Sequence, residues 1–164
     1  AVVIESGASR MTLDAVASKA HISKGGLLHH FPTKLALLDA MVRRQIERRQ
    51  KARKRIFEGL PVGPKRYVKG YVLSALNRDK GYDGLGAALF AAVVHEPKLT
   101  EPVRDIVKKT YGELESTDMK FEKAAIVALA ADALRLEEIL SVSPFTEEQR
   151  KRIIDELLRL IDEG

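Results

Sequence analysis

The segment SKGGLLHHFPTK at residues 23–34 combines two lysines, two histidines and two adjacent glycines. Lysine and histidine side chains can hold phosphate groups, and Lys24 can also reach a guanine edge. The glycines, Gly25 and Gly26, each cost a helix about 1 kcal/mol relative to alanine. Their presence in a segment that otherwise favours a helix indicates that a partner approaches the backbone closely. These residue types together predict binding of a nucleic acid.

The residues around this segment predict two helices joined by a tight turn. Thr12 can cap a helix that continues to residue 20, because the apolar residues after it follow helical spacing. After a turn at His21 and Ile22, Ser23 can cap a second, short helix, which Pro32 ends. In such a helix-turn-helix, the second helix enters the major groove of DNA and the first has its N-terminus at the phosphate backbone. The alternative is a helical hairpin in which the glycines serve packing.

The distribution of charge fits a polyanion partner for the N-terminal part only. The 164 residues carry a net charge of +5, but residues 1–55 hold 12 Lys/Arg against 4 Asp/Glu and the remainder is mildly acidic. A solvated basic surface is the other interpretation of this excess. The candidate DNA-binding residues are Thr12, Ser23, Lys24, Gly25, Gly26, His29, His30, Thr33 and Lys34.

Composition argues against several other classes of protein. The chain has no cysteine, so we expect neither disulfides nor thiolate metal sites, and a reducing cytoplasm fits. The longest apolar run, residues 124–131, is far shorter than the roughly 20 residues that span a bilayer, so no membrane partner is expected. His29 and His30 cannot easily share a metal ion, because adjacent helical positions do not face each other. Since no catalytic or phosphate-loop motif is visible either, we expect no enzyme activity, metal or cofactor.

Helical patterns and Gly/Pro punctuation at helix-length intervals predict an all-α chain. The expected boundary divides a three-helix DNA-binding domain at 1–45, with the helix-turn-helix at about 12–31 and a truncated first helix, from a second helical domain at 46–164. A loop where residues could be missing is expected at 115–119. The expected helices span 1–6 (closed by Gly7), 12–20, 23–31, 33–55, 64–77, 84–95, 100–115 and 119–140, with a last one starting at Thr146; the separators are 60–64, 77–81 and 96–97.

Residues 12–42, TLDAVASKAHISKGGLLHHFPTKLALLDAMV, resemble the DNA-binding domain of the TetR family of bacterial transcriptional regulators. Two departures stand out. His21 occupies a turn position usually held by glycine, where a left-handed backbone is required. Leu28 and His29 stand where the family often has a tyrosine that contacts phosphate. The family's pattern around the second helix is matched by Ser23, Lys24, Gly25, Leu27, His30, Phe31 and Lys34.

The resemblance implies a homodimer that binds a double-stranded DNA operator, and it implies that the helical domain at 46–164 serves regulation and dimerisation. The last two helices of each subunit would form a four-helix bundle with those of the partner, although the same alanines would equally serve a helix buried within one subunit. The interface residues implied are Ala128, Ala131, Leu134, Ile139, Ile154, Leu158 and Ile161.

The resemblance also implies a repressor that a small molecule releases from DNA, and we expect that effector to be apolar or aromatic. The rival interpretation is a helical protein–protein adaptor with a basic head. The candidate effector-binding residues on the middle helices are Tyr67, Tyr71, Phe90, Val94, His95 and Tyr111.

Overall fold

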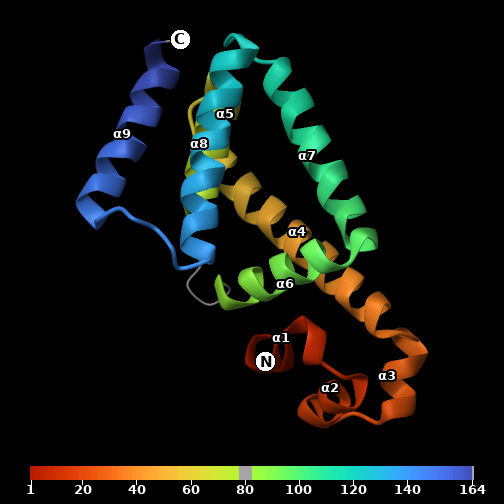
Figure 1. Cartoon of the computed structure of the whole chain (residues 1–164). Helices are drawn as coiled ribbons and strands as arrows, with labels where there is room; N and C mark the ends of the chain where they lie inside the picture. The colour runs from red at the N-terminus through yellow and green to blue at the C-terminus, as the bar shows by residue number, and fades with distance from the viewer. Residues whose placement is uncertain (78–82, 164) are drawn as a thin grey trace. The chain divides into compact units, whose positions relative to one another are not determined.

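The computed structural model describes residues 1–77 and 83–163, and every regular element among them is a helix, as the sequence predicts (Figure 1). In these ranges no helix is long and apolar enough to cross a membrane. The separator expected at 77–81 lies, apart from Asn77, outside the described residues. The elements are α1 Val2–Arg10, α2 Leu13–Ala20, α3 Lys24–His30, α4 Lys34–Gly59, α5 Arg66–Leu76, α6 Asp83–His95, the short 3-10 helix η1 Pro97–Leu99, α7 Thr100–Glu115, α8 Phe121–Ile139 and α9 Glu147–Glu163.

The chain folds into two compact units. Unit 1 comprises Ala1–Glu47 and Lys80–Asp105, and unit 2 comprises Arg48–Asp79 and Ile106–Gly164. Helices α4 and α7 contribute residues to both units. Unit 1 holds more than the expected N-terminal domain, because α6 packs against α1. The division of function between residues 1–45 and 46–164 stays a prediction.

The core of unit 1 lies beneath the helix-turn-helix. Side chains from α1, α4, α6 and η1 are buried together in it, among them Val3, Leu38, Leu89 and Leu99. The backbone of α1 leaves the helical conformation at Gly7, where φ is +76° and ψ is 157°, and helical structure then resumes to Arg10. The break expected at Gly7 is therefore present, and a second short helical segment follows it within α1.

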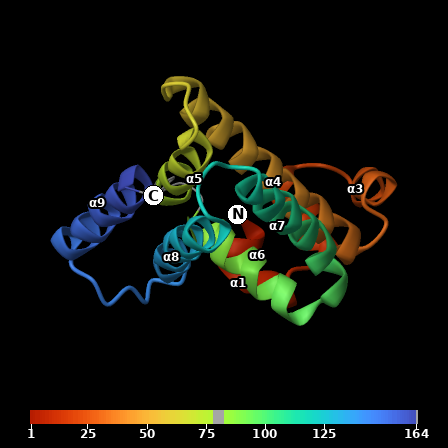
Figure 2. The ribbon, with the colours of Figure 1, turned by 90° about the horizontal axis from the view of Figure 1, so that it is seen from above.

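Unit 2 is built on the packing of α5 against α8 and of α9 against both (Figure 2). Three alanines of α8, Ala124, Ala128 and Ala131, are completely buried in this core. Small side chains at these positions let the backbone of α5 approach α8 closely. The other buried contributions come from Val68 and Val72 of α5, Leu114 of α7, and Leu157 and Ile161 of α9.

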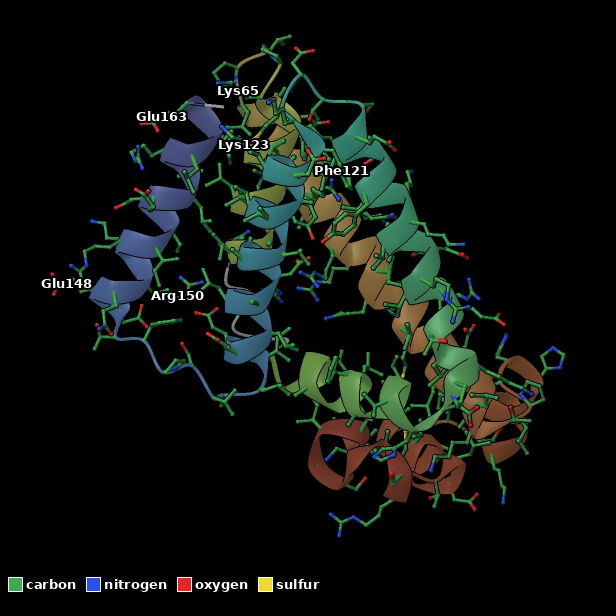
Figure 3. All side chains as sticks on the ribbon, turned by 45° about the horizontal axis from the view of Figure 1, so that its top comes forward. Lys65, Phe121, Lys123, Glu148, Arg150 and Glu163 are labelled. Atoms are coloured by element: carbon green, nitrogen blue, oxygen red, sulfur yellow. The ribbon has the colours of Figure 1, made fainter. Side chains whose placement is uncertain are left out.

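Polar contacts fix both ends of α9 within unit 2 (Figure 3). Near its start, Arg150 forms an ion pair with Glu138 of α8, with 2.5 Å between the atoms Nε and Oε1, and both side chains are largely buried. Near its end, the Nζ of Lys65 donates a hydrogen bond to the backbone carbonyl of Asp162 at 2.6 Å. A capping box at Thr146 begins the helix where the sequence predicts its start. Its reciprocal bonds run from the Thr146 N–H to the Gln149 side chain and from the Gln149 N–H back to the Thr146 hydroxyl.

Candidate functional site

The first half of the candidate DNA-binding site is α2 and the turn that follows it. The Thr12 hydroxyl accepts a hydrogen bond from the backbone N–H of Ala15 at 3.2 Å, so Thr12 caps α2 as the sequence predicts. His21 ends the helix in the left-handed conformation, with φ 55° and ψ 38°. Its N–H bonds to the carbonyl of Ser18, and this geometry lets the chain reverse direction before α3. The left-handed backbone expected at His21 is therefore confirmed.

One side of helix α3 packs against unit 1, and its other side is exposed. Ser23 caps it, accepting a hydrogen bond from the Gly26 N–H at 3.0 Å, and Leu27 is buried against the unit. Gly25 and Gly26 are exposed, and a Cβ built on Gly25 would meet no described atom within 4 Å. Because Gly25 leaves open space rather than a tight contact, packing within the chain does not explain this glycine. The hairpin alternative therefore loses its main support.

The charged residues around α3 already have partners within unit 1. The Nζ of Lys24 lies 2.8 Å from Oδ1 of Asp14 on α2, and the Nζ of Lys34 donates to the carbonyl of Ser9 at 2.6 Å. The Thr33 hydroxyl caps α4 by accepting from a backbone N–H. The structure thus gathers all nine candidate residues around α2, α3 and the start of α4. All are exposed except Lys34, which is half-buried.

Two family models match the sequence. The first, described as bacterial regulatory proteins of the tetR family, matches residues 1–41, and the second, a tetracyclin repressor-like C-terminal domain, matches residues 65–162. The second match alone covers more than half of the chain. The chain belongs to the TetR family of bacterial transcriptional regulators.

A solved structure agrees with this family at the level of the fold. The structure is similar to the crystal structure of a protein from Rhodococcus sp. described as a TetR-family transcriptional regulator, with a TM-score of 0.72. The similarity covers 98% of this chain and 91% of that chain, at 18% sequence identity, so it shows the fold alone. Among curated proteins, none matches the sequence.

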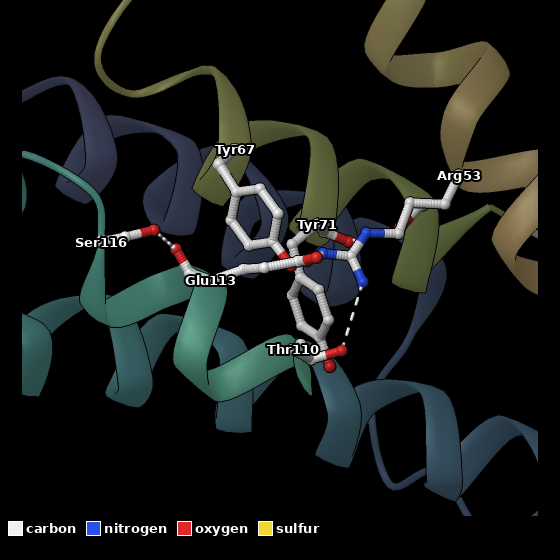
Figure 4. A network of polar contacts seen from close by, with 7 residues as sticks. Arg53, Tyr67, Tyr71, Thr110, Glu113 and Ser116 are labelled. Atoms are coloured by element: carbon white, nitrogen blue, oxygen red, sulfur yellow. Dashed lines mark hydrogen bonds and ion pairs between the residues drawn. The ribbon is translucent and has the colours of Figure 1, made fainter. Parts of the chain in front are cut away.

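Unit 2 of this TetR-family chain contains a network of polar side chains from α4, α5 and α7 (Figure 4). Arg53 of α4 donates to the hydroxyl of Tyr67 on α5, which in turn donates to the carboxylate of Glu113 on α7. A longer bond of 3.4 Å joins Arg53 to the hydroxyl of Thr110, which is buried. The helices α4, α5 and α7 are therefore tied together through one guanidinium group.

A second hydrogen bond connects α5 to α8. The Tyr71 hydroxyl donates to Oδ2 of Asp132 at 2.6 Å. Burial raises the pKa of Tyr71, and the neighbouring Asp132 carboxylate raises it further. Burial also raises the pKa of Asp132, although the hydrogen bond from Tyr71 and the charge of Arg49 act in the opposite direction. The buried environment of the Asp132 carboxylate thus disfavours its ionised form.

An open depression of about 510 Å³ lies beside this network. Of the six residues expected to bind an effector, Tyr67 is the one that lines it. Tyr71 and Tyr111 pack against the core of the same unit, whereas the expected residues of α6 belong to unit 1 and are exposed. The sequence-based set is thus divided between the two units. The depression is lined by Phe57, Gly63, Pro64, Arg66, Tyr67, Glu113, Ser116, Thr117 and Asp118.

The expected interface residues lie mainly in the core of the unit. Ala128, Ala131, Leu134 and Ile161 are buried by residues of the same chain, so they fit the alternative of a helix buried within one subunit. Ile139, Ile154 and Leu158 are partly buried. The same helices expose other apolar side chains, which we call the α8–α9 stripe: Ile126, Leu129, Leu136 and the C-cap residue Leu140 of α8, and Leu160 of α9.

Several residues of these sites carry no signal that sequence reasoning could use. Arg53 stands in a run of basic residues on α4 that is typical of a solvated surface, and Glu113 and Asp132 are each one of several acids on their helices. The α8–α9 stripe did have a signal. Its members on α8 recur at helical spacings of three, four or seven residues, and they are larger than the alanines that face the core.

Proposed function

We propose that the chain is a repressor that binds an operator as a homodimer and leaves it when a small molecule binds to unit 2. The observation that carries the DNA-binding part is the bare, exposed backbone at Gly25 and Gly26. This backbone starts the helix that a helix-turn-helix inserts into the major groove. Lys24, His29 and Lys34 supply the positive charge and hydrogen-bond donors that phosphates require.

A homodimer follows from the small footprint of one α3 helix. One such helix reads only a few base pairs, so useful specificity needs two half-sites related by two-fold symmetry. The α8–α9 stripe supplies a surface for this contact. Leu129 and Ile126 are 57% and 64% exposed, and a row of large apolar side chains can pack against its own copy without opposing charges. The buried alanines beneath the stripe then shape the interface without touching the partner.

Regulation requires that effector binding in unit 2 reach α3 in unit 1. Helix α4 supplies the connection, since it carries core residues of unit 1 near its start and Arg53 near its end. An effector that binds best to a conformation incompatible with DNA draws population from the DNA-binding one. A tenfold loss of DNA affinity requires a preference of about 1.4 kcal/mol. By linkage, operator DNA must weaken effector binding by the same factor.

The test is selection of genomic DNA fragments by the purified chain, followed by mobility-shift titration with competitor DNA. A regulator retains a preferred sequence in the presence of competitor, whereas an adaptor with a basic surface shows no sequence preference. Lys34→Ala should weaken binding to all sequences and reduce the salt dependence by about one phosphate contact. Binding that ignores both sequence and salt would refute the proposal.

A further inference from the structure

The guanidinium group of Arg53 lies among three aromatic rings of unit 2. Its Cζ atom is 4.8 Å from the centroid of Tyr67, 4.9 Å from that of Tyr71 and 5.5 Å from that of Phe57. All three distances fall within the range of a cation–π contact. We call Phe57, Tyr67 and Tyr71 the aromatic cage. The Arg53 side chain is only 17% exposed, so these contacts operate with little screening by water.

The packing of α5 shapes one wall of the cage. A Cβ built on Gly70 would lie 2.7 Å from the ring of Phe57, so only glycine lets this ring approach α5 so closely. The rings of Phe57 and Tyr67 are then 5.3 Å apart at an angle of 56°. The position of the Phe57 ring is thus set by the packing against Gly70 and not by Arg53 alone.

The polar groups of the cage also favour a cation. The Glu113 carboxylate lies 3.7 Å from a guanidinium nitrogen of Arg53 and accepts a hydrogen bond from the Tyr67 hydroxyl. Flat rings on several sides and a carboxylate at the edge are the features by which proteins bind organic cations.

The open depression gives the cage a path to solvent. Phe57, Tyr67 and Glu113 belong to both the cage region and the lining of the depression. Asp118 adds a second acid there. The one basic side chain in the lining, Arg66, is turned to the backbone carbonyl of Phe57, to which its Nε donates at 3.0 Å. A positively charged molecule entering from solvent therefore finds two carboxylates in the same lining as two of the rings.

We propose that the aromatic cage binds a planar organic cation, and that Arg53 occupies the cage until this effector displaces it. The inference rests on the proposed function for its regulatory meaning, since displacement would release α4 from α5 and α7. It also narrows the effector expected from the sequence, from an apolar or aromatic molecule to an aromatic one with a positive charge.

The test is calorimetric titration of the full chain with benzamidinium, and with neutral benzamide and anionic benzoate at matched ionic strength. Benzamidinium should bind at least about tenfold more tightly than either analogue, a difference of 1.4 kcal/mol. Glu113→Gln should weaken it about tenfold, whereas Glu115→Gln, an exposed acid of the same helix outside the cage, should leave it unchanged. Measurable benzamidinium binding that Glu113→Gln leaves unchanged would overturn the proposal.

A second variant covers the case in which Arg53 competes too strongly for the probe. Arg53→Met keeps an unbranched side chain but removes the charge, so benzamidinium should bind this variant more tightly than the wild type. A melting curve for each variant shows whether it is folded. If neither the wild type nor folded Arg53→Met prefers benzamidinium to benzoate, the cage is only a structural cross-link. Operator binding without any probe tests the proposed function separately.

Discussion

Lys24 of α3 is held by Asp14 of α2, with 2.8 Å between the atoms Nζ and Oδ1, and both side chains are more than half exposed. The ion pair must weaken when Lys24 turns toward DNA. Asp14→Asn leaves the lysine free and removes a negative charge close to the phosphates. Because an exposed pair contributes at most about 1 kcal/mol, we expect DNA affinity to rise about twofold to fivefold for any sequence. Fluorescence anisotropy with labelled duplexes measures this change.

The double variant separates the pair from a general effect of charge. In a Lys24→Gln background, Asp14→Asn should raise affinity less than it does in the wild type. An equal gain in both backgrounds would show that Asp14 acts on the DNA directly and not through Lys24.

Gly25 should matter for DNA binding and not for stability. The space around its Cα is open, so Gly25→Leu meets no clash in the free chain and the free energy of unfolding should stay unchanged or rise by up to about 1 kcal/mol. DNA affinity should fall by about tenfold or more, because leucine fills the space that the DNA must occupy when α3 enters the major groove. Gly112→Leu, at an equally open and exposed position of α7, is the control and should bind DNA normally. Normal DNA binding by Gly25→Leu would contradict the docking of α3.

The α8–α9 stripe and the buried alanines beneath it should respond differently to the same substitution. Leu129→Arg places a charge on the exposed stripe and should give folded monomers that lose operator affinity. Ala131→Arg places the charge in the core of unit 2, where the residue has no exposed surface, and should unfold the unit. Sedimentation and circular dichroism distinguish the two results. A folded Leu129→Arg dimer would remove the stripe from the interface.

Asp132 should make the stability of unit 2 depend on pH. Burial raises its pKa in the folded chain, so the folded state holds the proton more tightly than the unfolded state. The stability that the protonated Asp132 side chain contributes is complete below its pKa in the unfolded chain and is lost as pH rises through its higher pKa in the folded chain. Asp132→Asn stays neutral and can still accept the hydrogen bond from Tyr71. The variant should therefore gain stability relative to the wild type as pH rises above the ordinary range of aspartate, in urea unfolding at a series of pH values. The opposite trend would show that the neighbouring arginines outweigh burial.

The helices could be predicted because their ends are set by neighbouring residues. Thr12, Ser23 and Thr146 each cap the helix that follows, and each bond spans three residues. The turn at His21 was predicted from its place between two helices, and its left-handed backbone from the resemblance to the family. In contrast, the network around Arg53 reaches Thr110, which lies 57 positions along the chain, and no local pattern indicates which basic residue of α4 turns inward.

The face of α8 that packs within the chain could not be predicted from local sequence either. Alanines fit a close contact with another helix, whether that helix belongs to the same chain or to a partner. The sequence alone left both possibilities open for Ala128 and Ala131, and their burial against α5 and α9 settles which contact they make within the chain. The exposed Leu129 and Ile126 then become the residues available for a partner.

The unbroken run of α4 from Lys34 to Gly59 also limits how relatives of this chain can change in length. One residue inserted into a helix rotates everything after it by about 100° and advances it by about 1.5 Å. An insertion between Leu38 and Arg53 would therefore aim one of these side chains away from its neighbours. The loops at 60–65 and 116–120 have no such constraint, and they can absorb added residues without turning a helix. Among descendants of a common ancestor, we expect gaps to accumulate in those loops and α4 to keep its length while its surface residues drift.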